Sequence, residues 1–301
     1  MTAYRWLAAA AILFTFVQIV LGALTRLTGS GLACPDWPLC YGLLFPTPAK
    51  LAALPAVDFT YFQVMLEWSH RFNAAALVAP LILGLVMLGV SLIRTRPQLN
   101  WLAGLAISLL LIQGGLGRFT VLDRNSPWSV AVHLSVALVF LGVLIWAYRA
   151  ARPEPPVLIP AARRLVVGGA AVLVLATMAS GAMMAKSGAT LACGGWPLCD
   201  GAWIPDLSDG AVRLHFCHRL LAIATALVVV AAAWRLHPMR PAAAVIGIQV
   251  LVGAGVVVAF AGDSLAGQVA AGAIHQAIGV VLFATLIGVL WPPLVASDAG
   301  A

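Results

Sequence analysis

Charged side chains are scarce in this sequence: only 9% of its 301 residues are Asp, Glu, Lys or Arg, and just 10 are acidic. A soluble domain carries about 25% charged residues. Because 62% of the residues are hydrophobic, the composition excludes an ordinary soluble domain and predicts a polytopic membrane protein. The net charge of +7 is not accompanied by an aromatic-rich basic stretch, so we expect no nucleic-acid partner.

Long apolar runs recur along the whole chain. A helix that crosses a bilayer needs about 20 such residues, and its backbone groups must be bonded within the segment. Eight runs qualify, at roughly 6–24, 64–93, 99–117, 128–148, 164–184, 214–236, 242–261 and 268–291. We therefore predict an all-α integral membrane protein with eight transmembrane helices, the first being a retained helix and not a cleaved signal peptide.

Basic residues set the expected orientation. With the N-terminus inside, more Lys and Arg fall in the inner segments than in the outer loops, which hold most of the acidic residues. An excess of Lys and Arg near the cytoplasmic ends of the helices is the usual bias of membrane proteins. We expect an N-in, C-in protein of a bacterial-type cell membrane.

The chain repeats itself. The stretch "GSGLACPDWPLCYG" (29–42) matches "KSGATLACGGWPLCDG" (186–201), "SHRFNAA" (69–75) matches "CHRLLAI" (217–223), and residues 130–146 match 272–291. We predict two pseudo-symmetric four-helix bundles, residues 1–150 and 151–301, joined by a proline-rich basic connector at 149–164. An even number of helices per repeat gives parallel repeats, which disfavours an inverted-repeat transporter.

Four of the six histidines occupy repeat-equivalent places: His70, His133, His218 and His275. Each lies a few residues inside its helix, about 7–11 Å below the outer surface at 1.5 Å per residue. Ionisable residues inside membrane helices point to function, and paired imidazoles on facing helices suit the two axial positions of a haem iron. Hydrogen bonding between helices is the alternative interpretation.

Three further polar residues accompany these histidines. Arg71 and Arg219 directly follow theirs and are expected to bind haem propionates, since arginine pairs well with carboxylates. Glu67 lies one turn before His70, where the second half has His215. A carboxylate in that place can exchange protons or stabilise positive charge, or simply pair with Arg71. The difference makes the first half the expected reaction chamber.

Five cysteines complete the pattern. Cys34 and Cys40 bracket "PDWPL", and Cys193 and Cys199 bracket "GGWPL", in loops predicted to be extracytoplasmic. Disulfides persist there, so we expect one per half, serving as a staple or as a redox couple. The fifth, Cys217, is expected to be a packed apolar thiol. A C-x-x-C-H motif is absent, which excludes covalent c-type haem.

Taken together, these features resemble the heme A synthase family over nearly the whole chain. The resemblance is carried by the eight helices in two halves, "EWSHR" (67–71), "CHR" (217–219), the two later histidines and the "CPDWPLC" loop (34–40). It implies an enzyme that oxidises the C8 methyl of heme O to a formyl group by successive hydroxylations, giving heme A. Such an enzyme serves the cytochrome oxidase assembly machinery.

The resemblance also implies a division of labour. His70 and His133 would take the substrate heme O near the extracytoplasmic face, Glu67 would be the functional carboxylate, and His218 and His275 would hold a haem b cofactor. Heme O synthase would be the donor partner. The sequence carries no quinone or flavin motif and identifies no electron acceptor. The alternative is a diheme cytochrome b-type electron-transfer protein, which predicts two permanent haems and no need for Glu67.

Overall fold

The computed structural model describes residues 1–153 and 159–291, and every regular element in these ranges is helical. Eight spans are long and apolar enough to cross a membrane. They comprise α1 (Thr2–Leu27), a span made of α3 (Tyr61–Phe72), the π-helix η1 (Asn73–Val78) and α4 (Ala79–Ser91), then α5 (Pro97–Leu122), α6 (Pro127–Ala150), α7 (Ala161–Lys186), α8 (Gly210–Arg235), the pair η3 (His237–Met239) and α9 (Arg240–Ala261), and α10 (Leu265–Val289). The eight predicted helices are confirmed, and nearly all are a few residues longer than the apolar runs. Residues 154–158 of the predicted connector lie outside the described residues.

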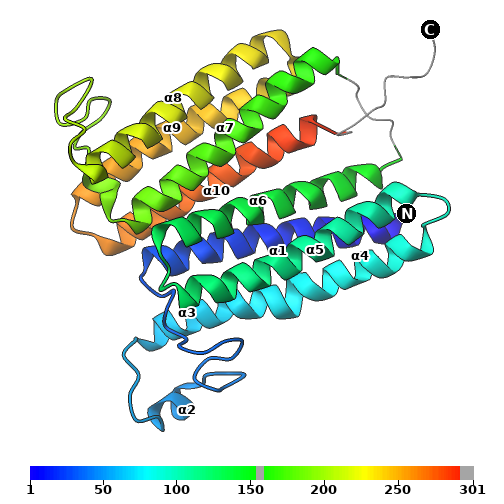
Figure 1. Ribbon diagram of the computed structural model, residues 1–301, viewed down its shortest axis with the longest axis horizontal. Coiled ribbons are helices and arrows are strands. Elements are labelled where there is room, and N and C mark those ends of the chain that lie inside the picture. The colour runs from blue at the N-terminus through cyan, green and yellow to red at the C-terminus, as the bar shows by residue number, and fades with distance from the viewer. Residues whose placement is uncertain (154–158, 292–301) are drawn as a thin grey trace.

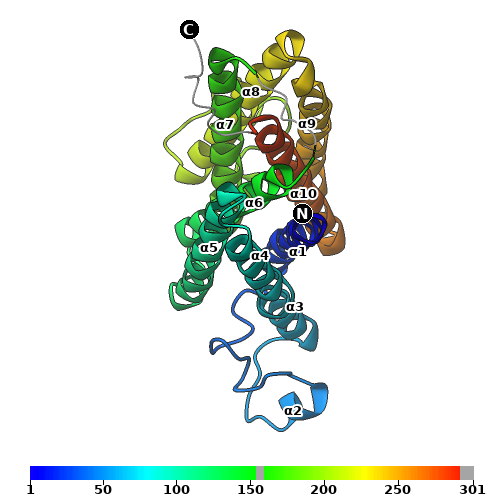
Figure 2. The ribbon, with the colours of Figure 1, turned by 90° about the vertical axis from the view of Figure 1, so that its right-hand side faces the viewer.

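The helices form two groups along the chain (Figure 1). In the first, α1 contacts α3, α4 and α6, and α5 packs between α4 and α6; in the second, α7, α8, α9 and α10 pack around one another. Both cysteine-bearing loops protrude at one end of the molecule, and the N-terminus lies at the other (Figure 1). Viewed nearly end-on, α6 and α1 lie between the remaining helices of the two groups (Figure 2).

Helix α6 belongs to both cores, because its apolar residues run all the way round. Leu138 and Leu141 pack into the core of the second group, while Phe140 and Leu144 pack with α1, α4 and α5. In lipid the hydrophobic effect does not drive helices together, so association depends on close van der Waals packing, favoured by small residues. The fully buried Ala8 of α1 fits that requirement.

The π-helix η1 interrupts the second span in the turn that follows His70. Proline 80 explains its position: Pro80 has no N–H to donate, and its ring would clash with the carbonyl four residues earlier in a regular helix. A local widening to π geometry accommodates it, and such π segments recur at functional sites. The corresponding helix of the second half, α8, is uninterrupted.

The first outer loop is the larger and has a small core of its own. Residues 28–60 include α2 (Pro48–Ala52), and the buried residues Leu51 and Val64 pack with the cysteines of this loop. Trp68 of α3 fixes the loop from below, donating its Nε1–H to the Leu44 carbonyl at 2.8 Å. The second loop contains η2 (Ala189–Leu191).

Candidate functional site

The four repeat-equivalent histidines lie on α3, α6, α8 and α10, each in the half of its membrane span that is nearer the cysteine loops. His70 and His133 are close enough to interact electrostatically, and so are His218 and His275. The structure therefore brings the histidines together in the expected pairs. Iron ligation by them stays a prediction.

A glycine of the neighbouring helix lies against each histidine ring. A Cβ added at Gly181 would fall 2.9 Å from Cε1 of His218; the corresponding distances are 3.0 Å for Gly253 and His275, 3.2 Å for Gly22 and His70, and 3.5 Å for Gly117 and His133. Gly117 and Gly253 lie in glycine-rich stretches of the sequence, whereas Gly22 and Gly181 do not. The repeat could have revealed them, since Gly22 and Gly181 each precede the first cysteine of their loop by 12 residues.

The hydrogen bonds of His218 favour one tautomer. Ser180 donates its hydroxyl to the Thr177 carbonyl at 2.8 Å, so its oxygen accepts from Nδ1 of His218, 2.9 Å away. Nδ1 therefore carries the proton, and Nε2 keeps its lone pair. A metal-binding histidine shows this arrangement, with one ring nitrogen donating to an outer partner and the other free for the metal.

A glutamine and an asparagine hold His70. The amide nitrogen of Gln18 lies 3.1 Å from both ring nitrogens, and its carbonyl accepts a 2.7 Å hydrogen bond from Asn73. Asn73, the first residue of η1, also donates to the Phe14 carbonyl. The π segment thus supplies the side chain that orients the Gln18 amide toward His70. Sequence reasoning missed both residues.

Glutamines also adjoin the other two histidines. Gln113 donates to the backbone carbonyl of His133 at 3.0 Å, and the Gln249 amide nitrogen lies 3.4 Å from Nε2 of His275. The buried Nδ1 atoms of His133 and His275 have no hydrogen-bond partner among the described residues. Buried ring nitrogens without partners are uncommon. Together with the free Nε2 of His218, they leave a ring nitrogen available for a metal on three of the four histidines, whereas both ring nitrogens of His70 lie beside the Gln18 amide.

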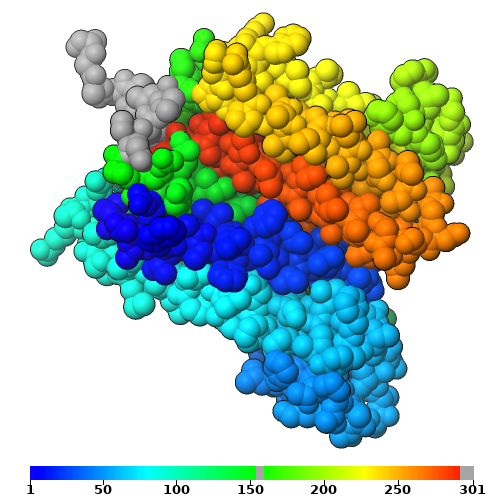
Figure 3. Space-filling view, turned by 180° about the vertical axis from the view of Figure 1, so that it is seen from behind, coloured from blue at the N-terminus to red at the C-terminus, as the bar shows by residue number. Residues whose placement is uncertain are grey.

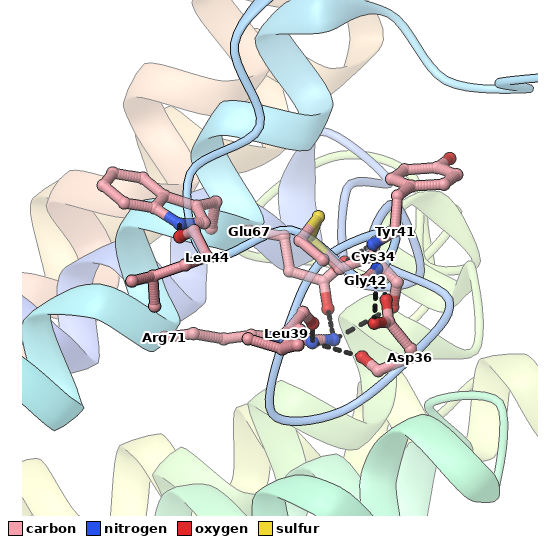
Figure 4. Close-up of a disulfide and its surroundings, with 10 residues drawn as sticks. Cys34, Asp36, Leu39, Tyr41, Gly42, Leu44, Glu67 and Arg71 are labelled. Carbon is pink, nitrogen blue, oxygen red and sulfur yellow. Dashed lines mark hydrogen bonds and ion pairs between the residues drawn. A yellow bond between two sulfur atoms is a disulfide. The ribbon is translucent and has the colours of Figure 1, made fainter. Parts of the chain in front are cut away.

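Glu67 and Arg71 hold the first cysteine loop onto α3 (Figure 4). Glu67 is 3% exposed; one carboxylate oxygen accepts from the Cys34 N–H at 2.8 Å and the other pairs with Arg71 at 2.5 Å. Arg71 also donates to the carbonyls of Cys34, Asp36 and Leu39. The pairing of Glu67 with Arg71, weighed above as an alternative, is present, and the carboxylate remains one helical turn from His70.

In the second half, a histidine takes the place of the glutamate in holding the cysteine loop onto its helix. His215, 3% exposed, lies 3.2 Å from the Ala189 carbonyl through Nδ1 and accepts from Nε of Arg219 at 3.1 Å through Nε2. Arg219 donates to the loop carbonyls of Cys193, Gly195 and Leu198. Both arginines therefore donate hydrogen bonds to loop carbonyls, and their binding of propionates stays a prediction.

Arg26 links the two halves. Its Nη2 donates to Oε1 of Gln276 at 2.7 Å, and the Gln276 amide donates to the Ile19 carbonyl at 3.2 Å. Gln276 directly follows His275, so a cation from α1 lies beside the second pair of histidines. Its buried Nε has no partner in the described residues. Arg26 therefore bonds across the two halves and does not simply extend toward the membrane interface.

Both predicted disulfides are present, Cys34–Cys40 and Cys193–Cys199. All four cysteines are buried, with at most 2% of their surface exposed. The prediction for Cys217 was wrong: this free thiol is exposed on α8 and not packed, because it points away from the helices that surround His218.

Fold and site together define a class: an eight-span helical membrane protein with two pairs of histidines beneath disulfide-stapled loops. The profile of the COX15-CtaA family, described as cytochrome oxidase assembly protein, matches residues 4–287. The chain belongs to this family.

Relatives of known identity agree with this placement. The heme A synthase of Halalkalibacterium halodurans is 33% identical over 234 residues, covering 73% of this chain and 72% of the relative. Those of Shewanella oneidensis and Alkalihalophilus pseudofirmus are each 29% identical, the first covering 77% of this chain and 78% of the relative, the second 90% of each.

Proposed function

We propose that this chain is a heme A synthase, a membrane oxidoreductase that converts heme O to heme A for cytochrome oxidase maturation. The observation that carries the proposal is the set of four half-buried histidines, each with its ring against a glycine of the neighbouring helix. Family membership and the names of its relatives support the activity.

The first half, residues 1–150, would take heme O, and the second, residues 151–301, would hold haem b. His70 and His133 would bind the substrate iron, while His218 and His275 would hold the iron of the cofactor. The favoured tautomer of His218 supports a cofactor site in the second half, since it leaves the Nε2 lone pair available. Haem b, when bound, supplies a one-electron redox centre.

The residues around His70 suit oxidation of a methyl group. Glu67 would hold or release a proton one turn from the substrate, and Arg71 would stabilise its ionised form. The first loop, with its own small core, would cover the substrate and exclude water. Because Glu67 also accepts the Cys34 N–H, protonation of the carboxylate would weaken this hydrogen bond to the disulfide loop.

The same geometry suggests how the protein is oriented. Both disulfide loops share one end, and disulfides persist on the extracytoplasmic side. We place both haem sites there, with the N-terminus in the cytoplasm. Heme O would arrive from heme O synthase through the membrane, since both haems are strongly apolar.

The test is to purify the protein after co-expression with heme O synthase and to extract its haems for chromatography and mass analysis. We expect heme A or its hydroxylated intermediate together with haem b. Haem b alone, at two per chain despite available heme O, would overturn the proposal and leave an electron-transfer cytochrome. The Glu67→Ala variant, prepared in parallel, should shift the product profile without loss of haem b.

A further inference from the structure

A groove of about 860 Å³ runs along the seam between the two halves, at the end opposite the disulfide loops. It is lined by α1, α6 and α10, with the start of α9 closing one side. Most of its wall is apolar, including Leu13 and Phe16 on α1 and Val281 and Ala284 on α10. The volume is within the range of ligand pockets, about 300–1,000 Å³.

The packing of α1 and α10 explains why the groove opens at this end only. Near the disulfide loops the helices are in close contact: a Cβ on Gly272 would lie 3.0 Å from the Leu27 side chain. Toward the other end α10 is tied to α6 instead, by the hydrogen bond from Trp146 to the Ile287 carbonyl at 3.1 Å. Helix α1 then diverges, and α6 is seen between α1 and α10 in Figure 3.

Arg149 gives the groove a positive end. It lines the groove together with Tyr148, and its buried Nε has no hydrogen-bond partner among the described residues. Arg149 is partly buried, and a buried nitrogen without an acceptor is unfavourable, so an anion that reaches this side chain would be favoured. The groove therefore combines apolar walls with a positive charge at one end, to which an anion could bind.

We propose that this groove binds one anionic phospholipid, with its phosphate on Arg149 and its acyl chains between α1 and α10. The apolar wall excludes water and matches acyl chains, and the guanidinium is a good donor to phosphate oxygens. A zwitterionic lipid would fill the channel equally well but would bring its own cation to a site that is already positive. The bound lipid would fill the seam where the two halves separate.

The experiment uses the full-length protein in nanodiscs with equal amounts of phosphatidylglycerol and phosphatidylethanolamine, followed by native mass spectrometry of the released protein. We expect one phosphatidylglycerol to be retained. In Arg149→Gln its retention should fall about tenfold or more, as expected for loss of a charge-assisted hydrogen bond. Arg94→Gln, which removes an exposed arginine from the α4–α5 turn at the same end, should retain the lipid like the unaltered protein.

A second variant fills the groove and leaves the charge in place. A Cβ on Gly288 meets nothing within 4 Å, so Gly288→Leu adds bulk to the groove without a clash and should also expel the lipid. Helical circular dichroism of each variant shows whether it remains folded. Equal retention of both lipids, a bound quinone in place of phospholipid, or undiminished phosphatidylglycerol in both variants would overturn the proposal.

Discussion

The glycines beneath the histidines allow a graded test of the haem sites. Each is replaced by alanine, and the added methyl falls at a known distance from the ring. The order of crowding is Gly181 at 2.9 Å, Gly253 at 3.0 Å, Gly22 at 3.2 Å and Gly117 at 3.5 Å. Carbon atoms pack best at about 3.5–4.0 Å, so the first two methyls must displace the ring by roughly half an ångström or more and the last need not displace it.

The expected effect is on haem affinity more than on folding. A histidine bound to iron cannot yield, whereas a free one can rotate away from the methyl. Overpacking of this kind costs about 1–3 kcal/mol, which lowers affinity by a factor of about 5 to 150. Haem b occupancy should fall for Gly181→Ala and Gly253→Ala. Heme O binding should fall less for Gly22→Ala and hardly change for Gly117→Ala.

The assay measures haem per protein by the pyridine haemochrome method and, separately, the Tm of the haem-free protein. Gly168→Ala, on the same helix as Gly181 with nothing within 4 Å of the added Cβ, is the matched control. Alanine for glycine inside a helix otherwise stabilises by about 0.5–1 kcal/mol, so the control should keep its haem and gain stability. If Gly181→Ala kept full haem b, or the control lost as much, the assigned cradle would be wrong.

Three further changes test neighbouring contacts. Ser180→Ala removes the acceptor that fixes the His218 tautomer; second-shell losses of this kind lower metal affinity about 10–100-fold, which a haem titration of the apoprotein would measure. Glu67→Gln keeps the size but loses the charge, so product formation should fall while haem b content, read from the Soret band, stays constant. Arg26→Gln removes a cation beside the second histidine pair, so the reduction potential of haem b should become more negative in a redox titration, because the oxidised iron is the more positive state.

Each of these has a control or a contrary result. Ser108→Ala removes an exposed helix serine that bonds only to the Gly104 carbonyl, and should leave haem binding unchanged. Equal haem affinity of Ser108→Ala and Ser180→Ala would contradict the tautomer argument. If Glu67→Gln formed as much product as the unaltered protein, Glu67 would serve only to anchor the loop. An unchanged potential in Arg26→Gln would mean that solvent screens this cation.

The helices and the pairing of the histidines could be predicted because both depend on patterns visible in the sequence itself, namely the length of apolar runs and the internal repeat. A run of about 20 apolar residues must be a helix in lipid, and a histidine that recurs in each repeat marks equivalent positions. The π-helix at Asn73–Val78 was harder to predict from the sequence, although Pro80 marks the place. A proline shows that the helix is disturbed but not whether it kinks or widens.

The loops show where sequence reasoning ended. Arg71 and Arg219 were identified as important, but their partners are backbone carbonyls, which every residue has and no sequence pattern distinguishes. The roles of Glu67 and His215 as loop anchors likewise depend on where Cys34 and Ala189 place their peptide groups. Only the folded loop brings those groups over the helix.

Helix α1 serves both histidine pairs, and this sharing distinguishes the two halves. Gln18 and Gly22 contact His70, and Arg26, one turn further along the helix, reaches Gln276, next to His275. The repeat-equivalent helices are α7 and α6. Ala185 of α7 stands where α1 has Arg26, counted back from the first cysteine of each loop. Leu134 of α6 stands where α10 has Gln276, directly after the histidine. Among the described residues, the link between Arg26 and Gln276 has no such counterpart between α7 and α6. It joins the helix that seats His70 to the helix that carries His275, so a displacement of α1 on filling of the first site would be transmitted to the second.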